Sequence, residues 1–411
     1  MKKLKTIFSP RKVIVWIFLI VLIVTVPEIT KPAMSETEAI ITMMSIDKVD
    51  EKIKVSAAVL TPANEKTANY EVFSGTGKTL GEAVENVSLA LGKSMGFAQC
   101  EIMAIGENLS KDGIMSSLDF MTRTRKVGRN ALLINFSGEV EEFQQAVVNL
   151  NIEKSLPLED VFNFDKRYIP TEDSNIHSFY KGYFSKISTG VIPKVQLLKE
   201  KTDNSIEIES GSTGGGTSSE PGSGSGGQNS KQYLLNDGTL SVFKDGKKLL
   251  ELDPNNMKKL NLLLNTEQEG TLKVENVNDS FFKNSNVVLN ITEKNVKFNP
   301  KFENNLPVFK IEIELAVLVE EVDEENPDKS FLKRNKEFLT PNLVKKAEET
   351  VKLEAMNVIE YCKSKQIDLI GVYENFYRKH YKKFKKYYDE NKEKYLNGIQ
   401  YDVSVKVSSS Y

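Results

Sequence analysis

A glycine- and serine-rich stretch near the middle of the chain limits how the whole sequence can fold. Residues 211–230 read GSTGGGTSSEPGSGSGGQNS and contain no side chain that could join a hydrophobic core. Such a stretch behaves as a flexible coil, because it cannot bury enough apolar surface to offset the entropy lost on ordering. We therefore interpret residues 205–231 as a Gly/Ser-rich linker or disordered insertion, with a folded region on each side, residues 36–204 and 232–411.

The N-terminus carries a second strong signal, a basic tail followed by an apolar run. Residues 1–12 contain five basic residues and no acidic one, and residues 13–26 read VIVWIFLIVLIVTV. At ~1.5 Å per residue the apolar run covers ~21 Å of the ~30 Å hydrocarbon layer, and Ile7 and Phe8 extend it. We interpret residues 13–26 as a transmembrane anchor or a signal sequence, with residues 1–12 as a cytoplasmic tail.

Cleavage after the apolar run is the alternative to an anchor. Ala33-Met34-Ser35 is a small-x-small cleavage site, but it lies rather far from the apolar core, so we favour the uncleaved helix. Under either interpretation the positive-inside rule places the chain after Pro27 outside the cytoplasm.

Composition excludes several classes of function. The 411 residues include 55 Lys and Arg against 57 Asp and Glu, a net charge of −2, whereas nucleic-acid binders usually carry a clear basic excess. The two cysteines and the two histidines are solitary and form no metal-ligand spacing. We therefore assign no catalytic, cofactor-binding or metal-binding residues, and predict a non-enzymatic protein without cofactors.

Hydrophobic periodicity predicts alternating strands and helices between residues 36 and 204. Alternation of this kind is typical of a sheet covered by helices. The predicted strands are Ala39–Ser45, Lys52–Leu60, Glu71–Phe73, Glu101–Ile105 and Ala131–Phe136, and the predicted helices are Leu80–Leu91, Leu109–Thr122 and Val140–Asn149.

The region after residue 232 is also mixed, which predicts an α+β fold class: a multi-domain mixed sheet-and-helix ectodomain behind a single N-terminal transmembrane helix. Asp245-Gly246 predicts the turn of a hairpin. The predicted strands are Leu240–Lys244, Leu249–Leu252, Thr271–Asn276, Asn286–Thr292, Lys294–Phe298, Val308–Val319 and Tyr401–Val407, and the predicted helices are Met257–Leu264, Leu343 to about Lys363, and Tyr373–Tyr388.

One pentapeptide, Gly75-Thr76-Gly77-Lys78-Thr79, resembles the end of a nucleotide-binding P-loop. A complete P-loop needs a further glycine at position 72, where this chain has Val72. Thr79 and Glu82 instead fit a capping box, and Gly92 stands where a C-terminal cap belongs. We therefore interpret the motif as a strand–turn–helix junction and predict no nucleotide binding.

The chain has two clusters of basic residues, and each could be either an ordinary solvated part of a helix or a binding site. The aromatic residues of Tyr373–Tyr388 recur at helical spacing, which favours a packed amphipathic helix with solvated lysines over a site for anionic headgroups or nucleic acid. The second cluster consists of Arg123, Arg125, Lys126 and Arg129. We interpret it as the solvated C-terminus of a helix, where the helix dipole favours positive charge.

Six segments together resemble the Ger(x)C family, the C subunits of bacterial spore nutrient-germinant receptors. The resemblance begins near Glu38 and covers most of the chain, and the order and spacing of the segments carry it rather than any single match. The segments are IDKVDEKIKVSAAVLTP (46–62), GTGKTLGEAVENV (75–87), GFAQCEIMAIGENLSKDGIMSSLDFMTR (96–123), STGVIPKVQLL (188–198), GTLSVFKDGKKLLELDPNNMKKLNLLL (238–264) and IDLIGVYENFYRKHYKKFKK (367–386).

The resemblance implies a three-domain α+β ectodomain at the outer face of a membrane, the spore inner membrane. It also implies polytopic A-type and transporter-like B-type receptor subunits as partners, with no catalytic residues. Family members usually carry a lipobox cysteine just after the signal, but residues 25–36 read TVPEITKPAMSE and contain no cysteine. Lipid attachment there is excluded, so the helix of residues 13–26 would be the anchor.

The sequence thus predicts a membrane-anchored, non-enzymatic ectodomain subunit of a germinant receptor. It would dock on the polytopic subunits and support nutrient-triggered germination. The alternative is an extracytoplasmic solute-binding or scaffold protein unrelated to germination.

Overall fold

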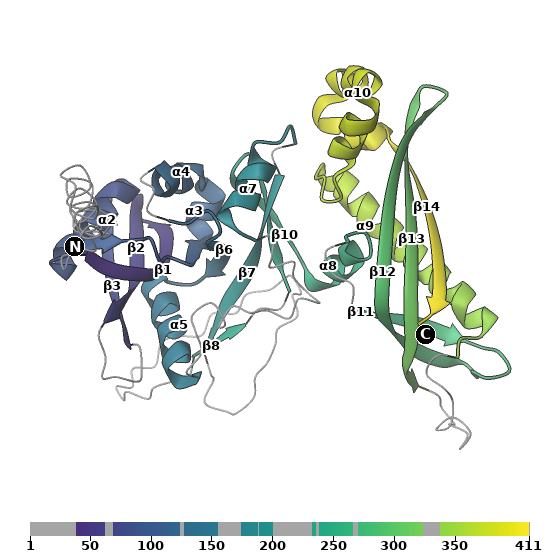
Figure 1. Ribbon diagram of the computed structural model, residues 1–411, viewed down its shortest axis with the longest axis horizontal. Helices are drawn as coiled ribbons and strands as arrows, with labels where there is room; N and C mark the ends of the chain where they lie inside the picture. The colour runs from purple at the N-terminus through teal and green to yellow at the C-terminus, as the bar shows by residue number, and fades with distance from the viewer. Residues whose placement is uncertain are drawn as a thin grey trace, which may run out of the picture.

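The protein has a mixed α+β architecture with two separate sheets, which lie side by side along the longest axis of the molecule (Figure 1). The first half of the chain builds most of one sheet, and the second half builds the other. The computed structural model describes residues 38–61, 69–123, 127–154, 174–187, 189–199, 232–235, 238–265, 270–323 and 338–410.

The first sheet combines a parallel centre with antiparallel margins. Its strands are β1 (Glu38–Val49), β2 (Lys52–Thr61), β3 (Asn69–Gly77), β4 (Ser94–Gly96), β5 (Ile102–Gly106), β6 (Leu132–Ser137), β7 (Thr189–Lys199), β8 (Gln232–Leu235), β9 (Leu240–Lys244) and β10 (Lys247–Leu252). The order is β10-β9-β7-β6-β5-β1-β2-β3, with β4 beside β1 and β8 beside β7. Strands β1, β5, β6 and β7 are parallel neighbours, and the pairs outside them on this path are antiparallel.

Helices cover both faces of this sheet, because its central strands are apolar on both sides. Met43 and Met44 are both fully buried although they are adjacent in β1 and so point to opposite faces. Met43 belongs to the core under α5 (Val140–Lys154), and Met44 belongs to the larger core on the other face. The larger core is formed with α2 (Leu80–Leu91), α3 (Glu107–Asp112), α4 (Met115–Arg123) and α7 (Ile176–Tyr183).

The second sheet is formed by four strands and is covered by helices on one face. The strands are β11 (Gly270–Val277), β12 (Ser285–Glu303), β13 (Leu306–Asp323) and β14 (Gln400–Ser409), and the helices are α8 (Pro254–Asn261), α9 (Pro341–Lys365) and α10 (Val372–Asn391). The strands follow the order β11-β12-β13-β14, in which only the β13–β14 pair is parallel. A 3₁₀ helix, Lys392–Gly398, leads from α10 into β14.

Most predicted elements are found, and several have different bounds. Helix α2 has the predicted bounds, and the predicted apolar face of α9, which includes Leu343 and Cys362, is buried. The single helix predicted over Leu109–Thr122 is wrong: α3 ends before Gly113, whose φ of +132° is outside the helical range. Residues 286–292 and 294–298, predicted as two strands, belong to the continuous β12.

The Gly/Ser-rich segment 205–231 lies outside the described residues, and so do the predicted tail 1–12 and the predicted anchor or signal sequence 13–26. Within the described ranges, no helix combines the length and the apolar character that membrane crossing requires. The hairpin β9–β10 follows the segment in sequence but joins the first sheet through β7. The division into regions 36–204 and 232–411 stays a prediction.

Candidate functional site

The pentapeptide that resembles a P-loop forms the junction between β3 and α2. A Cβ atom at Gly75 would lie 2.7 Å from the backbone oxygen of Ala83, and one at Gly77 would lie 2.5 Å from its nitrogen. Both distances are too short for a real contact, so the two glycines allow α2 to pack directly on β3. The side chain of Lys78 is exposed.

Hydrogen bonds of the capping-box type fix the start of α2. The Thr79 hydroxyl accepts a bond of 3.2 Å from the backbone N–H of Glu82, and Glu82 Oε2 accepts one of 2.7 Å from the backbone N–H of Lys78. Gly92 ends the helix with a φ of +65°. The Thr79 hydroxyl therefore caps the N-terminus of α2.

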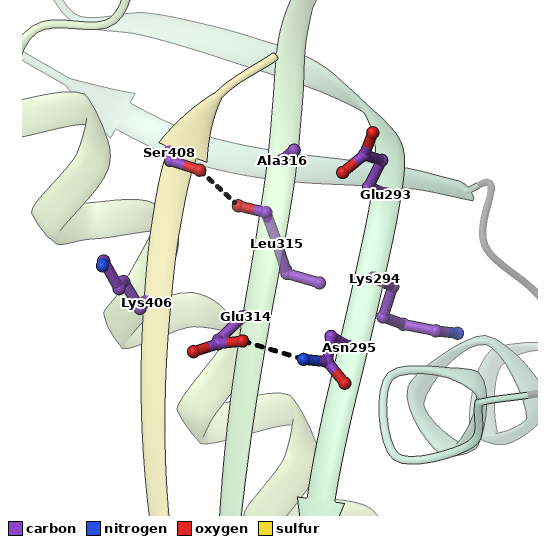
Figure 2. Close-up of a pocket in the computed structure, with 8 residues that line it drawn as sticks. All are labelled: Glu293, Lys294, Asn295, Glu314, Leu315, Ala316, Lys406 and Ser408. Atoms are coloured by element: carbon purple, nitrogen blue, oxygen red, sulfur yellow. Dashed lines mark hydrogen bonds between the residues drawn. The ribbon is translucent and has the colours of Figure 1, made fainter.

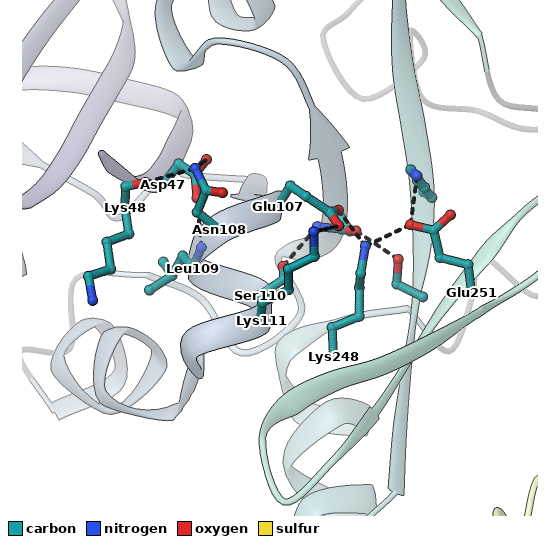
Figure 3. A network of polar contacts seen from close by, with 12 residues as sticks. Asp47, Lys48, Glu107, Asn108, Leu109, Ser110, Lys111, Lys248 and Glu251 are labelled. Carbon is teal, nitrogen blue, oxygen red and sulfur yellow. Dashed lines mark hydrogen bonds and ion pairs between the residues drawn. The ribbon is translucent and has the colours of Figure 1, made fainter. Parts of the chain in front are cut away.

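A polar network around α3 connects this helix to β1 and to the hairpin β9–β10 (Figure 3). Asp47 on β1 accepts a bond of 2.7 Å from the backbone N–H of Leu109. Lys248 on β10, with a side chain 5% exposed, pairs with Glu107 on α3 and with Glu251 at 2.7 Å. The segment 96–123, quoted for the family resemblance, contains Ile105-Gly106-Glu107. These residues lead into α3 and provide Glu107 to the network.

The network shifts the pKa values of its carboxyl groups in opposite directions. Burial raises the pKa of Asp47, and its backbone hydrogen bonds only partly offset this effect. Burial also acts to raise the pKa of Glu107 and of Glu251, but hydrogen bonds from lysines outweigh it and hold both pKa values below their usual range. The lysines are Lys111 and Lys248 for Glu107, and Lys194 and Lys248 for Glu251.

Strand β9 is buried on both faces and contributes to the cores of both sheets. Phe243 packs in the core of the first sheet, whereas Leu240 and Val242 pack in the core of the second. The Ser241 hydroxyl donates a hydrogen bond to Asn135 on β6. The strand continues through β10 into α8, which joins the second core. We call the hairpin β9–β10 the junction hairpin, since it connects the two halves.

A small cavity of about 110 Å³ lies between the two halves, beside the junction hairpin. Asp368 lines it and is buried, accepting bonds of 2.8 Å each from the backbone N–H groups of Val372 and Tyr373 and from the Tyr395 hydroxyl. Burial raises the pKa of Asp368. The buried oxygen Oε1 of Gln366, which also lines this cavity, has no hydrogen-bond partner among the described residues.

The basic aromatic helix differs from its prediction in one respect. Tyr373 and Phe384 are buried as expected, but Tyr377 and Tyr381 are 37% and 45% exposed. The predicted stripe assumes a straight helix, whereas α10 kinks at His380, where φ is −137° and ψ is 41°. The buried face of α10 contains Tyr373, Phe376 and Phe384, and Tyr377 and Tyr381 lie outside it, so the prediction of one continuous packed stripe is wrong.

The remaining sequence candidates are separated from one another. Arg123 pairs with Asp119 at 2.7 Å, Arg129 is exposed, and residues 125 and 126 lie outside the described part. Cys100 and Cys362 are buried free thiols in different cores. In the described ranges no group of three or more His, Cys, Asp or Glu residues could hold a metal ion.

A hollow on the uncovered face of the second sheet has a mixed polar lining (Figure 2). Glu314 accepts bonds from the Asn295 amide at 2.9 Å and from Lys297 at 3.4 Å, and Lys294 bonds to the Asn261 carbonyl oxygen at 2.5 Å. These groups contact neighbours within the protein, so the hollow presents no converging set of reactive groups.

Comparison with known proteins agrees with this architecture. The model described as the spore germination protein N-terminal domain matches residues 35–197. The model described as spore germination B3/GerAC like, C-terminal, matches residues 239–409. A search of curated proteins gives no match.

Among solved structures, the crystal structure of the GerBC protein has a similar fold, with a TM-score of 0.50. The alignment covers 89% of this chain and 96% of that chain at 15% identity, so it bears on the fold alone. The two domain matches follow one another along the chain. The first ends before residues 205–231, and the second begins after them. The chain therefore belongs to the Ger(x)C family of spore germination proteins.

Proposed function

We propose that this chain is a non-enzymatic ectodomain subunit of a spore germinant receptor. The observation that supports this role is the pair of spore-germination domains, which match residues 35–197 and 239–409 in order. The subunit acts by non-covalent docking on polytopic A-type and B-type subunits. It stabilises or transmits a change of state that nutrient binding elsewhere in the receptor triggers.

The second part of the proposal is that the apolar residues 13–26 hold the ectodomain at the membrane as an uncleaved helix. The run is strongly apolar and follows a basic tail, Ile7 and Phe8 extend it, and no lipobox cysteine follows it. Sequencing the N-terminus of the protein in native membranes tests this directly. An N-terminus at Met1 supports the anchor, and one at Glu36 refutes it.

The junction hairpin provides a physical route for such transmission. Because β9 is part of both cores, a displacement of the second sheet would act on the first through this strand. The polar network of Lys248 fixes the hairpin to α3 on the side of the first sheet. A partner that binds either half would therefore influence the other half through this strand.

Deletion of the gene is the decisive experiment. We expect loss of a nutrient germination response while non-nutrient triggers still act, and restoration by the wild-type gene. Co-purification of the tagged full chain with polytopic subunits from spore membranes tests the docking step. An unchanged response to every nutrient would contradict the receptor function.

The alternative function is an extracytoplasmic solute-binding or scaffold protein. The junction cavity favours it, because Gln366 Oε1 is buried there without a partner among the described residues. Genes for A-type and B-type membrane subunits beside this one would favour the receptor. Thermal stabilisation of the chain by a small polar solute, lost in Gln366→Ala, would favour the alternative.

Nucleotide hydrolysis at Lys78 is the enzymatic alternative. We expect no nucleotide binding by the wild-type chain or by Lys78→Ala, because the glycines of the motif pack against α2. Nucleotide-dependent stabilisation of the wild type that Lys78→Ala abolishes would contradict a non-enzymatic role.

A further inference from the structure

The solvent-exposed side of α10 carries a concentrated positive charge. Residues 378–386 contain six basic residues and no acidic one, although the whole chain has a net charge of −2. Most of them share one exposed area with two tyrosines, which we call the basic-aromatic surface. It consists of Tyr377, Arg378, Tyr381, Lys382, Lys385 and Lys386.

Few ion pairs within the protein involve this surface, although the exposed acids Asp389 and Glu390 follow it on the same helix. Arg378 pairs with Glu374 at 2.8 Å. Across the described ranges, no carboxylate forms an ion pair with Lys382, Lys385 or Lys386. Like charges this close repel one another, so an external anionic surface would stabilise them. The surface is therefore electrostatically suited to an anionic partner.

The two tyrosines add an amphipathic component. The rings of Tyr377 and Tyr381 lie 4.8 Å apart between centroids, and Lys385 Nζ lies 6.0 Å from the centroid of the Tyr381 ring. Both side chains are exposed, whereas Tyr373, Phe376 and Phe384 on the same helix are buried. Tyrosine and lysine together are typical of the level of lipid headgroups, where a ring meets apolar chains and its hydroxyl meets water.

The end of the β12–β13 hairpin lies beside α10 (Figure 1). The His380 ring donates a bond of 2.9 Å from Nε2 to the Pro300 carbonyl oxygen, and Lys379 donates one of 3.1 Å to the Phe298 carbonyl oxygen. The hairpin therefore fixes the position of α10.

We propose that the basic-aromatic surface rests on the anionic phospholipid headgroups of a membrane. Exposed lysines without a carboxylate partner suit a fluid headgroup layer better than a structured protein interface, which favours fixed, bidentate arginine pairs. This contact concerns lipid and not the polytopic subunits. Its failure would therefore leave the proposed receptor function intact.

Tryptophan fluorescence of the full chain provides the test. Trp16 is the single native tryptophan, so Trp16→Phe combined with Tyr381→Trp places one indole in the basic-aromatic surface. The full chain is reconstituted in phosphatidylcholine vesicles with brominated acyl chains, with or without about 30% phosphatidylglycerol. We expect quenching in the anionic vesicles only, and its loss at about 0.5 M salt, where charges are screened within a few ångström.

Matched variants separate lipid contact from general electrostatics. Reversing Lys382, Lys385 and Lys386 to Glu should abolish the quenching, whereas reversing the exposed residues Lys93, Lys345 and Lys352, which lie outside α10, should leave it unchanged. An indole placed by Leu353→Trp, at an exposed site on α9, should not be quenched. Circular dichroism verifies that every variant is folded.

Two results would overturn the proposal. One is equal quenching, or none, in neutral and anionic vesicles at low salt. The other is an indole that remains unquenched by lipid but becomes shielded from aqueous iodide when polytopic receptor subunits are reconstituted together with the chain. The second result would assign the basic-aromatic surface to a protein partner.

Discussion

The hydroxyl of Ser241 on β9 donates a hydrogen bond of 2.7 Å to Oδ1 of Asn135 on β6, across 106 positions of the sequence. Both side chains are fully buried. The Asn135 amide nitrogen donates in turn to the Ile105 carbonyl oxygen and to the Ser110 hydroxyl, at 2.8 Å each. One buried side chain thus joins the junction hairpin to the parallel strands and to α3.

Removing either member of this pair should destabilise the protein by about 1–3 kcal/mol, because a buried polar group is left without its partner. We expect Asn135→Ala to cost more than Ser241→Ala, since the asparagine makes more hydrogen bonds. Urea unfolding of both single variants and the double variant should give a coupling energy of about 0.5–3 kcal/mol. Thr271→Ala, at an exposed position on β11, is the control. If the losses of unfolding free energy in the two single variants simply add up in the double variant, a direct bond between Ser241 and Asn135 is contradicted.

Lys248→Met should reduce stability in a pH-dependent manner. The substitution keeps an unbranched apolar side chain, one atom shorter, but removes the cation from Glu107 and Glu251. At pH 7 we expect a loss of about 2 kcal/mol, less than for a fully buried pair because both carboxylates are partly exposed. The exposed neighbour Lys247 provides the matched control Lys247→Met.

The sign of the pH dependence follows from the direction of the pKa shifts. The pKa values of Glu107 and Glu251 lie below their ordinary value of 4.5 in the folded protein. Their contribution to stability is therefore complete above that value and disappears as the pH falls through the folded pKa values. Chemical unfolding between pH 7 and pH 3 should show the wild type and Lys248→Met converging on the acid side. A difference that stays constant would contradict the electrostatic origin.

Gly75→Ala and Gly77→Ala should each destabilise the protein by about 1–3 kcal/mol, because the added methyl group would overlap the backbone of α2. Gly128→Ala is the control, since no atom lies within 4 Å of a Cβ at that position. We expect it to change the free energy of unfolding by less than about 0.5 kcal/mol. Thermal unfolding that leaves Gly75→Ala and Gly77→Ala as stable as Gly128→Ala would exclude the packing role.

Both cysteines should resist alkylation until the protein unfolds. Burial raises the pKa of Cys100 and of Cys362 to about 12. At pH 8 the reactive thiolate is then about a thousandfold scarcer than in a free cysteine. Mass spectrometry after iodoacetamide treatment should find both thiols unmodified in native protein and modified in guanidinium chloride. Rapid labelling of Cys362 in native protein would contradict its buried position.

The sequence predicted correctly those elements whose bounds or buried faces are set by residues close together in the chain. The capping residues Thr79 and Gly92 fixed the bounds of α2, and the apolar repeat of α9 identified its buried face. Local signals failed where a distant contact decides the conformation. The α10 stripe is interrupted at His380, whose ring bonds to Pro300 on β12, and helix α7 was not predicted at all.

The sequence by itself determined the fold class, the family resemblance and the structural meaning of Gly75 and Gly77, because these depend on periodicity, caps and the order of short segments. Only the tertiary structure decided that the junction hairpin joins the first sheet while packing in both cores. It also decided that Tyr377 and Tyr381 face solvent. These features arise from contacts between residues far apart in the chain, and no local pattern encodes which partner a strand or a helix face will meet.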